Sequence, residues 1–240
     1  MDVPIDAFVD LVRDHKKPGM SVAEIGCFDG ATSKYAIVPV HEMKGTYTVV
    51  DWFKGTRVPD WEASSGEHVY KPDKHVRKDF ERNLTGFESC YKIIESTTQE
   101  ASLSFDDESL DICFIDADHS YRAVAKDLDL YFPKVKRGGI ICGHDFDDAT
   151  PDFSLCRKAM AFSEEELSRD WVPLNHRSDI EELKLFLDRN PMSFHQPWLG
   201  DNLIRFHGGV AKAVYERFGE DINRVPNQHH SPPIWWKYKE

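Results

Sequence analysis

The stretch VAEIGCFDGATS, residues 22–33, decides the fold of this chain. Its apolar start predicts a strand that carries Glu24, followed by Gly26 and Gly30 and by a helix that begins around residues 31–33. A backbone that bends sharply at a strand end, and lets a ligand approach without a Cβ, needs glycines there. The following helix start offers free N–H groups. The spacing E-x-G-x-x-x-G therefore indicates either a ligand-binding turn or an ordinary tight strand-to-helix turn.

Outward from this turn, predicted strands and helices alternate along the chain. Short runs rich in β-branched or aromatic residues predict further buried strands at residues 46–52, 90–96, 110–118 and 138–145. Apolar residues at helical spacing predict helices around residues 5–12, 76–84 and 121–131, the last entered through Ser120 as N-cap. Such alternation indicates parallel strands joined by right-handed crossovers. We expect a doubly wound α/β sheet with helices on both faces.

The alternation fails between residues 147 and 206, a stretch with twelve Asp or Glu against seven Lys or Arg. Ile180, Leu183 and Leu187 lie there at helical spacing. We expect a helical insertion within a single domain of residues 1–240, acting as a cap or as a subunit contact of a homo-oligomer. Regular structure resumes with Val210, Val214 and Phe218 as a helix, and IWWKYK predicts the last strand.

Composition excludes several classes of protein. The formal net charge is −12, which argues against nucleic-acid binding. Hydrophobic residues make up 40% of the chain, enough for a well-filled core, so wholesale disorder is excluded. Acids stand where a secretory signal would carry Lys or Arg, and no apolar run approaches the roughly 18 residues of a membrane span. The five cysteines are odd in number and favour buried thiols. We expect a soluble, cytoplasmic protein.

Two polar segments that carry aromatic residues have two interpretations each. Residues 58–75 predict either a lid over a ligand or a long surface loop. Residues 190–202 predict either a stacking surface for sugar rings or packing of the insertion on the core.

An acid ends the second predicted strand. Asp51 follows TYTVV and lies 25 residues beyond Gly26, near the roughly 20-residue offset at which an acid reaches the ribose hydroxyls of a bound nucleoside. Its alternative interpretation is a solvated strand terminus. Trp52 beside it is a candidate to lie against an adenine face or to serve packing only. The absence of G-x-G-x-x-G disfavours NAD or FAD as the nucleoside.

Acids and histidines follow the next two strands. Asp116 and Asp118 lie at the end of the run 110–118 and His119 follows it, while His144 and Asp145 end the run 138–145. Neighbouring parallel strands bring their carboxyl ends together, so these side chains should face one another. Carboxylates that lie so near one another raise each other's pKa or bind a cation. His144 and Asp118 are the candidate general bases, with His119 a lesser one; the alternative is capping or loop histidines.

Four motifs in this order resemble the class I S-adenosylmethionine-dependent methyltransferases. They are E-x-G-x-x-x-G, the acid after the second strand, FIDADHSY after the fourth and KRGGIICGHDF at the fifth. More narrowly, they are similar to small-molecule and sugar O-methyltransferases of the catechol and macrocin type. The resemblance covers residues 20–148 and more loosely 208–240. It implies a Rossmann-like sheet of seven strands with the last antiparallel.

The resemblance also implies roles for individual residues. The cofactor contacts would be Glu24, Gly26, Gly30, Asp51, Ser96 and Asp116. A divalent ion, Mg²⁺ or Mn²⁺, would bind Asp118 and Asp145, with His144 or Asp116 completing the set. Relatives carry Asp-Asp or Asp-Asn after strand five where this chain has His144-Asp145. That departure would suit Mn²⁺ or a softer ion, or would free His144 to act as base.

The sequence thus predicts a methyltransferase that uses S-adenosylmethionine to alkylate a hydroxyl of a small molecule, with a sugar or glycan preferred. A nicotinamide-dependent oxidoreductase on a similar sheet is the first alternative. The second is a non-catalytic nucleoside-binding module, which would keep Gly26, Gly30 and Asp51 but would not need the acids and histidines.

Overall fold

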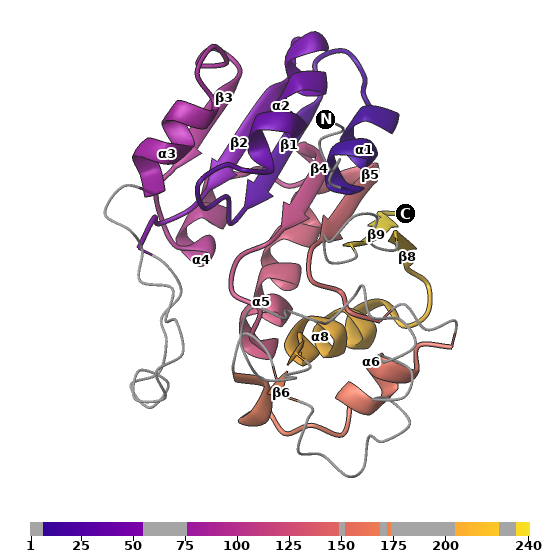
Figure 1. Ribbon diagram of the computed structural model, residues 1–240. Coiled ribbons are helices and arrows are strands. Elements are labelled where there is room, and N and C mark those ends of the chain that lie inside the picture. Colours follow the sequence, from indigo (N-terminus) through magenta and orange to yellow (C-terminus); the bar gives the residue numbers. More distant parts are fainter. Residues whose placement is uncertain (1–6, 55–75, 149–151, 169–171, 174–204, 226–233) are drawn as a thin grey trace, which may run out of the picture.

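The computed structural model describes residues 7–54, 76–148, 152–168, 172–173, 205–225 and 234–240 (Figure 1). The segments at 58–75 and 190–202 and the apolar stripe of Ile180, Leu183 and Leu187 lie outside these residues. The interpretations of those segments therefore stay predictions.

The described residues form one seven-stranded sheet in the order β3-β2-β1-β4-β5-β9-β8. Its strands are β1 (Ser21–Ile25), β2 (Thr46–Val50), β3 (Tyr91–Ile94), β4 (Leu110–Ile115), β5 (Val135–Gly143), β8 (Asn223–Val225) and β9 (Ile234–Tyr238). The first five are mutually parallel, and Figure 1 shows them pointing toward the same edge of the sheet. Strand β9 is antiparallel to both neighbours. The predicted Rossmann-like sheet with an antiparallel last strand is confirmed.

Strand β8 was not anticipated from the sequence. It has three residues, exposed or half-buried, and pairs only through β9 among the described strands. Because it forms the edge, the last strand of the chain lies inside the sheet instead of at its margin. A strand this short and this exposed carries no apolar alternation from which it could be predicted.

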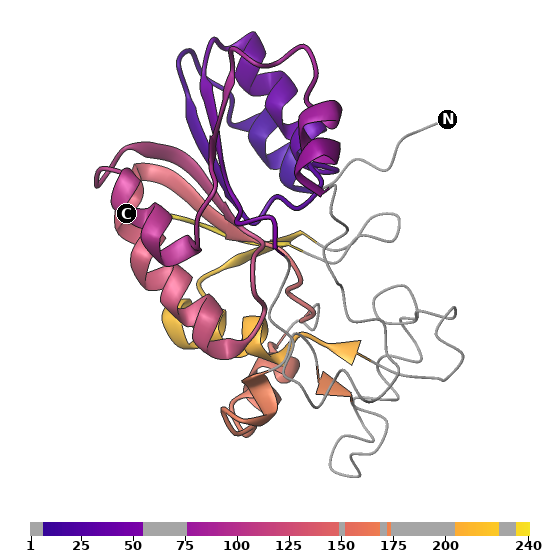
Figure 2. The same cartoon turned by 90° about the vertical axis from the view of Figure 1, so that its left-hand side faces the viewer.

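Helices cover both faces of the sheet, as Figure 2 shows. One face carries α1 (Ala7–Asp14), α2 (Ser33–Glu42) and α3 (Val76–Asn83); the other carries α4 (Thr98–Ala101), α5 (Tyr121–Tyr131) and α8 (Gly208–Phe218). Strand residues alternate between the two faces: Tyr47 and Val49 pack with α1 to α3, whereas Val50 packs with α5 and α8. Alternation with burial on both faces is the pattern of a doubly wound sheet.

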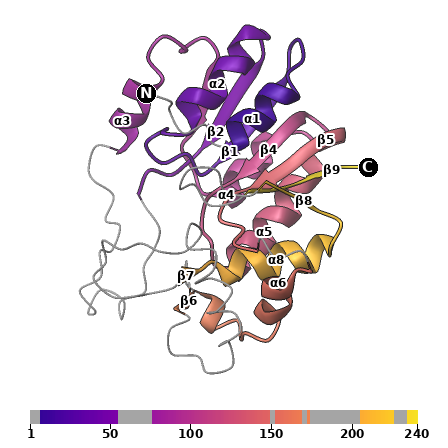
Figure 3. The ribbon, with the colours of Figure 1, turned by 45° about the vertical axis from the view of Figure 1, so that its right-hand side comes forward.

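Several described elements between β5 and α8 in the sequence lie near α8. Helix α6 (Ser154–Ala159), the 3₁₀ helix η3 (Glu166–Ser168) and the short pair β6 (Val172–Pro173) and β7 (Arg205–Phe206) lie there (Figure 3). Leu155, Cys156 and Phe162 are buried in the same hydrophobic cluster as Val210 of α8. The described part of the predicted insertion therefore contains a short helix, a 3₁₀ helix and a strand pair and contributes to the core, while the helical character and extent of the insertion stay predictions.

Further sequence expectations concern cysteines and membrane association. All five cysteines lie in described residues and are free and buried, as expected. Among the described helices, none has the length and apolar character that a bilayer crossing requires.

Candidate active site

The glycine turn is organised by Asp51. Its Oδ2 accepts hydrogen bonds from the backbone N–H of Cys27 (3.1 Å) and Phe28 (2.8 Å), and its Oδ1 accepts from Phe53 N–H (2.6 Å). Phe28 and Phe53 have φ angles of 46° and 54°, which bulky residues rarely adopt. Hydrogen bonds from these amides to the Asp51 carboxylate offset this backbone strain. Asp51 thus fixes the glycine turn directly, an arrangement that the sequence analysis did not predict, and its contact with ribose hydroxyls stays a prediction.

Glu24 lies beneath the turn. It is 1% exposed, and its carboxylate accepts from Ser33 Oγ at the start of α2 and from Tyr47 Oη on β2 (2.7 Å). Burial, and then the Glu24 charge, hold the pKa of Tyr47 well above its usual value, so the phenol stays a donor. This placement favours a role in positioning the turn, and the expected contact of Glu24 with a cofactor stays a prediction.

The two glycines of the turn pack closely against other segments of the protein. Gly26 has a φ of 90°, and a Cβ there would lie 2.1 Å from the carbonyl oxygen of Asp116. Gly30 has a φ of 75°, and its Cβ would lie 2.8 Å from Phe80 of α3. Gly26 therefore brings the turn against the end of β4, while Gly30 lets α3 pack on the turn. The need for glycine at both positions comes first from packing.

The end of β4 meets the end of β5 through two carboxylates and two imidazoles. His119 Nε2 lies 3.3 Å from both Asp116 Oδ1 and Asp145 Oδ2. His144 Nδ1 lies 3.7 Å from Asp116 Oδ1 and 3.5 Å from Asp145 Oδ2. Asp145 itself has a φ of 54°, an uncommon backbone conformation of the kind that concentrates at functional sites. The predicted convergence of the strand ends is present for these four residues.

Three further predicted residues lie outside this group of four. Asp118 Oδ1 accepts from Ser120 N–H (2.8 Å) at the start of α5, and Asp118 is not in either group of described residues whose ligand atoms approach one another closely. Ser96 Oγ donates to Glu100 (2.9 Å), and Trp52 is half-buried beside Asp51. The structure therefore does not bring Asp118 together with His144 and Asp145; Asp116 is the acid that lies with them.

Sequence reasoning missed His207 and Asp147. His207 is the N-cap residue of α8, and both its backbone N–H (2.6 Å) and its Nδ1 (3.0 Å) contact Asp147 Oδ2. His207 Nδ1 also lies 3.9 Å from Asp145 Oδ1, and its ring meets that of His119 edge-on at 5.3 Å. A lone histidine 60 residues from its partner gives no sequence signal. The cluster of Asp116, His119, His144, Asp145, Asp147 and His207 is called the acid–histidine cluster below.

Burial and charge oppose each other in this cluster. Burial alone would raise the pKa of Asp145, but His207, His144 and His119 hold it well below its usual value. Burial raises the pKa of Asp147 despite the opposing effect of His207. Burial would lower the pKa of His207, but Asp145 and Asp147 outweigh it and raise that pKa to about 9. Perturbed groups gathered at strand ends are typical of functional sites.

The residues present fit a nucleoside at this edge. A carboxylate offers about four acceptor positions, and the described residues take three on Asp51, which leaves one for a ribose hydroxyl. Phe28, 38% exposed, and half-buried Trp52 offer apolar surface beside it. The donor set also fits a cation, because two groups of three residues, His119, Asp145 and His207 and Asp116, His144 and Asp145, have ligand atoms within 4.8 Å of one another.

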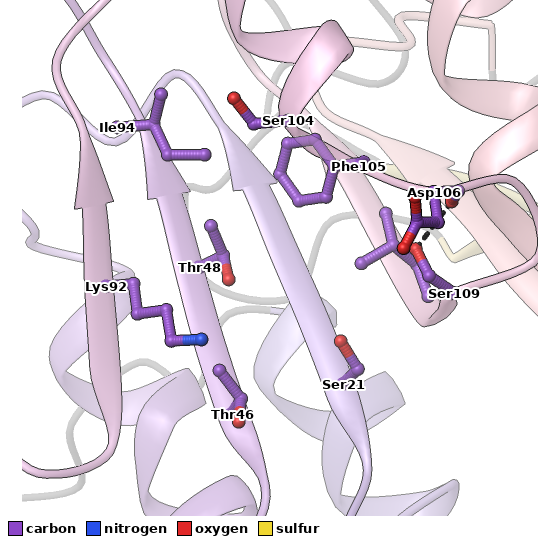
Figure 4. A pocket seen from close by; sticks show the side chains of 10 residues that line it. Ser21, Thr46, Thr48, Lys92, Ile94, Ser104, Phe105, Asp106 and Ser109 are labelled. Atoms are coloured by element: carbon purple, nitrogen blue, oxygen red, sulfur yellow. Dashed lines mark hydrogen bonds between the residues drawn. The ribbon is translucent and has the colours of Figure 1, made fainter.

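A cavity of about 270 Å³ lies elsewhere, against the face of β1 to β3 next to η1 (Ser102–Ser104). Figure 4 shows Lys92 extending over this face beside Thr46 and Thr48. None of the predicted site residues lines it. We therefore place the candidate active site at the strand ends, where the perturbed groups gather.

Comparison with known proteins identifies one matching family and several solved structures with a similar fold. A family model described as "Methyltransferase domain" matches residues 23–146. No curated protein matches the chain in sequence. Cofactor-bound Rv0187 from MTB is 10% identical with a TM-score of 0.55, covering 99% of this chain and 82% of that one. The SAH-bound methyltransferase PaMTH1 of Podospora anserina is 14% identical with a TM-score of 0.50, covering 97% and 76%.

A third similar structure comes from Klebsiella pneumoniae and is provisionally named an O-methyltransferase. It is 12% identical with a TM-score of 0.51, covering 100% of this chain and 92% of that one. At such identities the three structures show a shared fold.

Proposed function

Because this chain belongs to the methyltransferase domain family, whose model spans more than half of it, we propose that it transfers a methyl group from S-adenosylmethionine to a hydroxyl of a small molecule. The family match over residues 23–146 supports the transferase assignment. The observation that supports a hydroxyl acceptor is the acid–histidine cluster, which lies against the glycine turn at the point where Gly26 meets Asp116.

The chemistry asks two things of the protein. When bound, S-adenosylmethionine supplies a methyl group on a sulfonium that leaves as a neutral thioether. The protein must therefore align the acceptor oxygen for in-line displacement and remove its proton. A hydroxyl with a pKa far above 7 needs a base or a Lewis acid to become a nucleophile.

The cluster can meet the second demand. The side chains of His119 and His144 are 16% and 15% exposed, so both are partly accessible while they stay close to Asp116 and Asp145. Carboxylates at these distances orient an imidazole and stabilise its protonated form. We assign proton removal to His144 or His119, and alignment of the acceptor to Asp116. A divalent cation held by Asp116, His144 and Asp145 would instead polarise the acceptor oxygen, and proton removal would then fall to His119, because a ring nitrogen that binds the ion cannot act as the base.

The acceptor we propose is neutral and rich in hydroxyls, with a sugar or glycan as first candidate. The formal charge of −12 repels polyanionic molecules. Carboxylates and imidazoles instead supply acceptors and donors for neighbouring hydroxyls.

Calorimetric titration of the full chain with S-adenosylhomocysteine and, separately, with NAD⁺ tests the cofactor. We expect S-adenosylhomocysteine to bind and NAD⁺ not to bind; the opposite pattern would make the protein an oxidoreductase. Binding without turnover on a panel of sugars and catechols would favour the non-catalytic module. His144→Ala should lower kcat by about 10²- to 10⁴-fold if His144 is the base, and His41→Ala, at an exposed position on α2, is its matched control.

A further inference from the structure

The cavity beside β1 to β3 is lined by polar side chains whose hydrogen-bonding groups the protein does not use. Within the described residues, six of these side chains have neither a hydrogen-bond nor an ion-pair partner: Ser21, Thr46, Thr48, Lys92, Ser104 and Asp106. Thr48 is 7% exposed, and a polar side chain buried to this degree normally has a partner in the protein or in a bound molecule. Such side chains gathered around one cavity indicate a binding site separate from the candidate active site.

The short connection between β3 and β4 explains why this part of the sheet face is open. Its helical elements, α4 and η1, comprise four and three residues and together span about 12 Å. The five residues of β2 span about 17 Å, so the connection covers only part of the strand. Ala101 and Phe105 share a hydrophobic cluster with Val50 at the carboxyl end of β2, whereas Thr46 and Thr48, nearer its start, line the cavity.

Two exposed side chains of opposite charge flank the cavity. Lys92 lies on β3 and Asp106 precedes β4, and β2 and β1 lie between those strands in the sheet (Figure 4). The carboxylate of Asp106 and the formal charge of −12 disfavour a purely anionic ligand, and the ammonium of Lys92 disfavours a purely cationic one. The two charges together complement a molecule that carries one carboxylate and one ammonium group.

We infer that this cavity binds a small zwitterion of the ω-amino acid class, with its carboxylate at Lys92 and its ammonium at Asp106. The volume of about 270 Å³ admits about nine non-hydrogen atoms, because a water molecule takes up about 30 Å³ of liquid. Ile94, Phe105 and Leu110 also line the cavity and suit a short hydrocarbon chain between the two charges. The inference goes beyond the proposed function and does not depend on it.

Calorimetric titration of the full chain with glycine, β-alanine, γ-aminobutyrate and 5-aminopentanoate tests the inference. The charged groups of these compounds are progressively farther apart, so the series also measures the separation that the site accepts. We expect saturable binding of one molecule per chain for the best-fitting member. Butyrate and butylamine, which each lack one charge, should bind at least about 10-fold more weakly. No saturable binding by any member, or equal binding of butyrate or butylamine, would overturn the inference.

Variants locate the zwitterion. Lys92→Gln and Asp106→Asn each remove one charge and should each weaken binding of the best-fitting compound about 10-fold. Thr48→Val keeps a β-branched side chain without the hydroxyl and should weaken binding about 2- to 10-fold. Lys78→Gln, at an exposed position on α3 at the other face of the sheet, is the matched control. Circular dichroism confirms that each variant is folded, and unchanged affinity in both charge variants would refute the assignment.

Titration in the presence of S-adenosylhomocysteine separates this site from the candidate active site. Ser21 and Thr46, the first residues of β1 and β2, line the cavity, whereas the candidate active site lies at the carboxyl ends of the strands. Affinity for the zwitterion should therefore be the same with and without S-adenosylhomocysteine. Competition between the two compounds would place the zwitterion at the strand ends and overturn the inference. A chain that binds the zwitterion through Lys92 but does not bind S-adenosylhomocysteine keeps this site and loses the proposed function.

Discussion

Gly26→Ala is the substitution whose outcome the structure determines most sharply. Gly26 directly follows β1 and has a φ of 90°, and its N–H donates to Val50 O on β2 (2.8 Å). An added Cβ would lie 2.1 Å from Asp116 O and 2.7 Å from Ala117 Cα, which are backbone atoms that cannot rotate away. The end of β4 must therefore move, together with the acid–histidine cluster that it carries.

The expected loss of unfolding free energy in Gly26→Ala has two parts. Left-handed backbone costs an alanine about 1–2 kcal/mol, and overpacking against fixed atoms costs about 1–3 kcal/mol. The sum is about 2–5 kcal/mol. For a chain of this size each kcal/mol lowers Tm by about 2–4 °C, so Gly26→Ala should lower Tm by about 4–20 °C.

Gly86→Ala is the matched control. Gly86 follows α3 with a φ of 95°, and a Cβ there meets nothing within 4 Å. Gly86→Ala has the same backbone cost as Gly26→Ala but no steric contact of the added Cβ. The effect of alanine on the unfolded chain is the same in both variants. The difference in unfolding free energy between the two variants should therefore be about 1–3 kcal/mol.

Urea unfolding followed by circular dichroism measures the difference, and calorimetry with S-adenosylhomocysteine measures the effect on the site. We expect Gly26→Ala to be the less stable variant and to lose affinity, and Gly86→Ala to bind as the parent does. Equal stability of the two variants would refute the close approach of β1 to the end of β4.

Further substitutions test the supports of the site and a buried acid away from it. Asp51→Ala leaves the amides of the glycine turn without their acceptor and should weaken S-adenosylhomocysteine binding more than 10-fold by calorimetry; unchanged affinity would remove its role. Glu24→Gln loses a charged acceptor worth about 1.5–3 kcal/mol, so the urea midpoint should fall while the folded protein binds S-adenosylhomocysteine normally; lost affinity at full stability would instead make Glu24 a cofactor contact. Asp127 is 2% exposed on α5, and burial raises its pKa to about 7 despite a hydrogen bond from Thr98. Because the folded pKa lies above the usual 3.8, its contribution to stability is present below about pH 4 and lost as the pH rises through about 7. Tm measured from pH 4 to 8 should fall less in Asp127→Asn than in the parent, and parallel profiles would contradict the buried charge.

Much of the sheet could be predicted because burial imposes a period on the sequence. Residues of β1, β2, β4 and β5 alternate between two cores, so each strand reads as a short apolar run. The location of Asp51 at the same edge as the glycine turn was equally predictable, since parallel strands place their carboxyl ends at one edge. The same rule brought His144 and Asp145 to the end of β4.

Sequence could not decide which polar groups face one another at that edge. Among Asp116, Asp118 and His119, the path of a few loop residues turns Asp118 toward the start of α5 and Asp116 toward His144. A one-residue change of direction is not encoded in residue type, because the same acids suit a helix cap or a ligand.

The sequence by itself determined the order of strands and helices, the glycine turn and the acids that follow the strands, because these depend on neighbours close in the chain. Only the tertiary structure buried Glu24 under the turn and brought His207 to Asp145 and Asp147. The packing of α8 on α5 and α6 closes that contact across some 60 residues. Contacts made by packing between distant elements leave no periodic trace in the sequence, and here they complete the candidate active site.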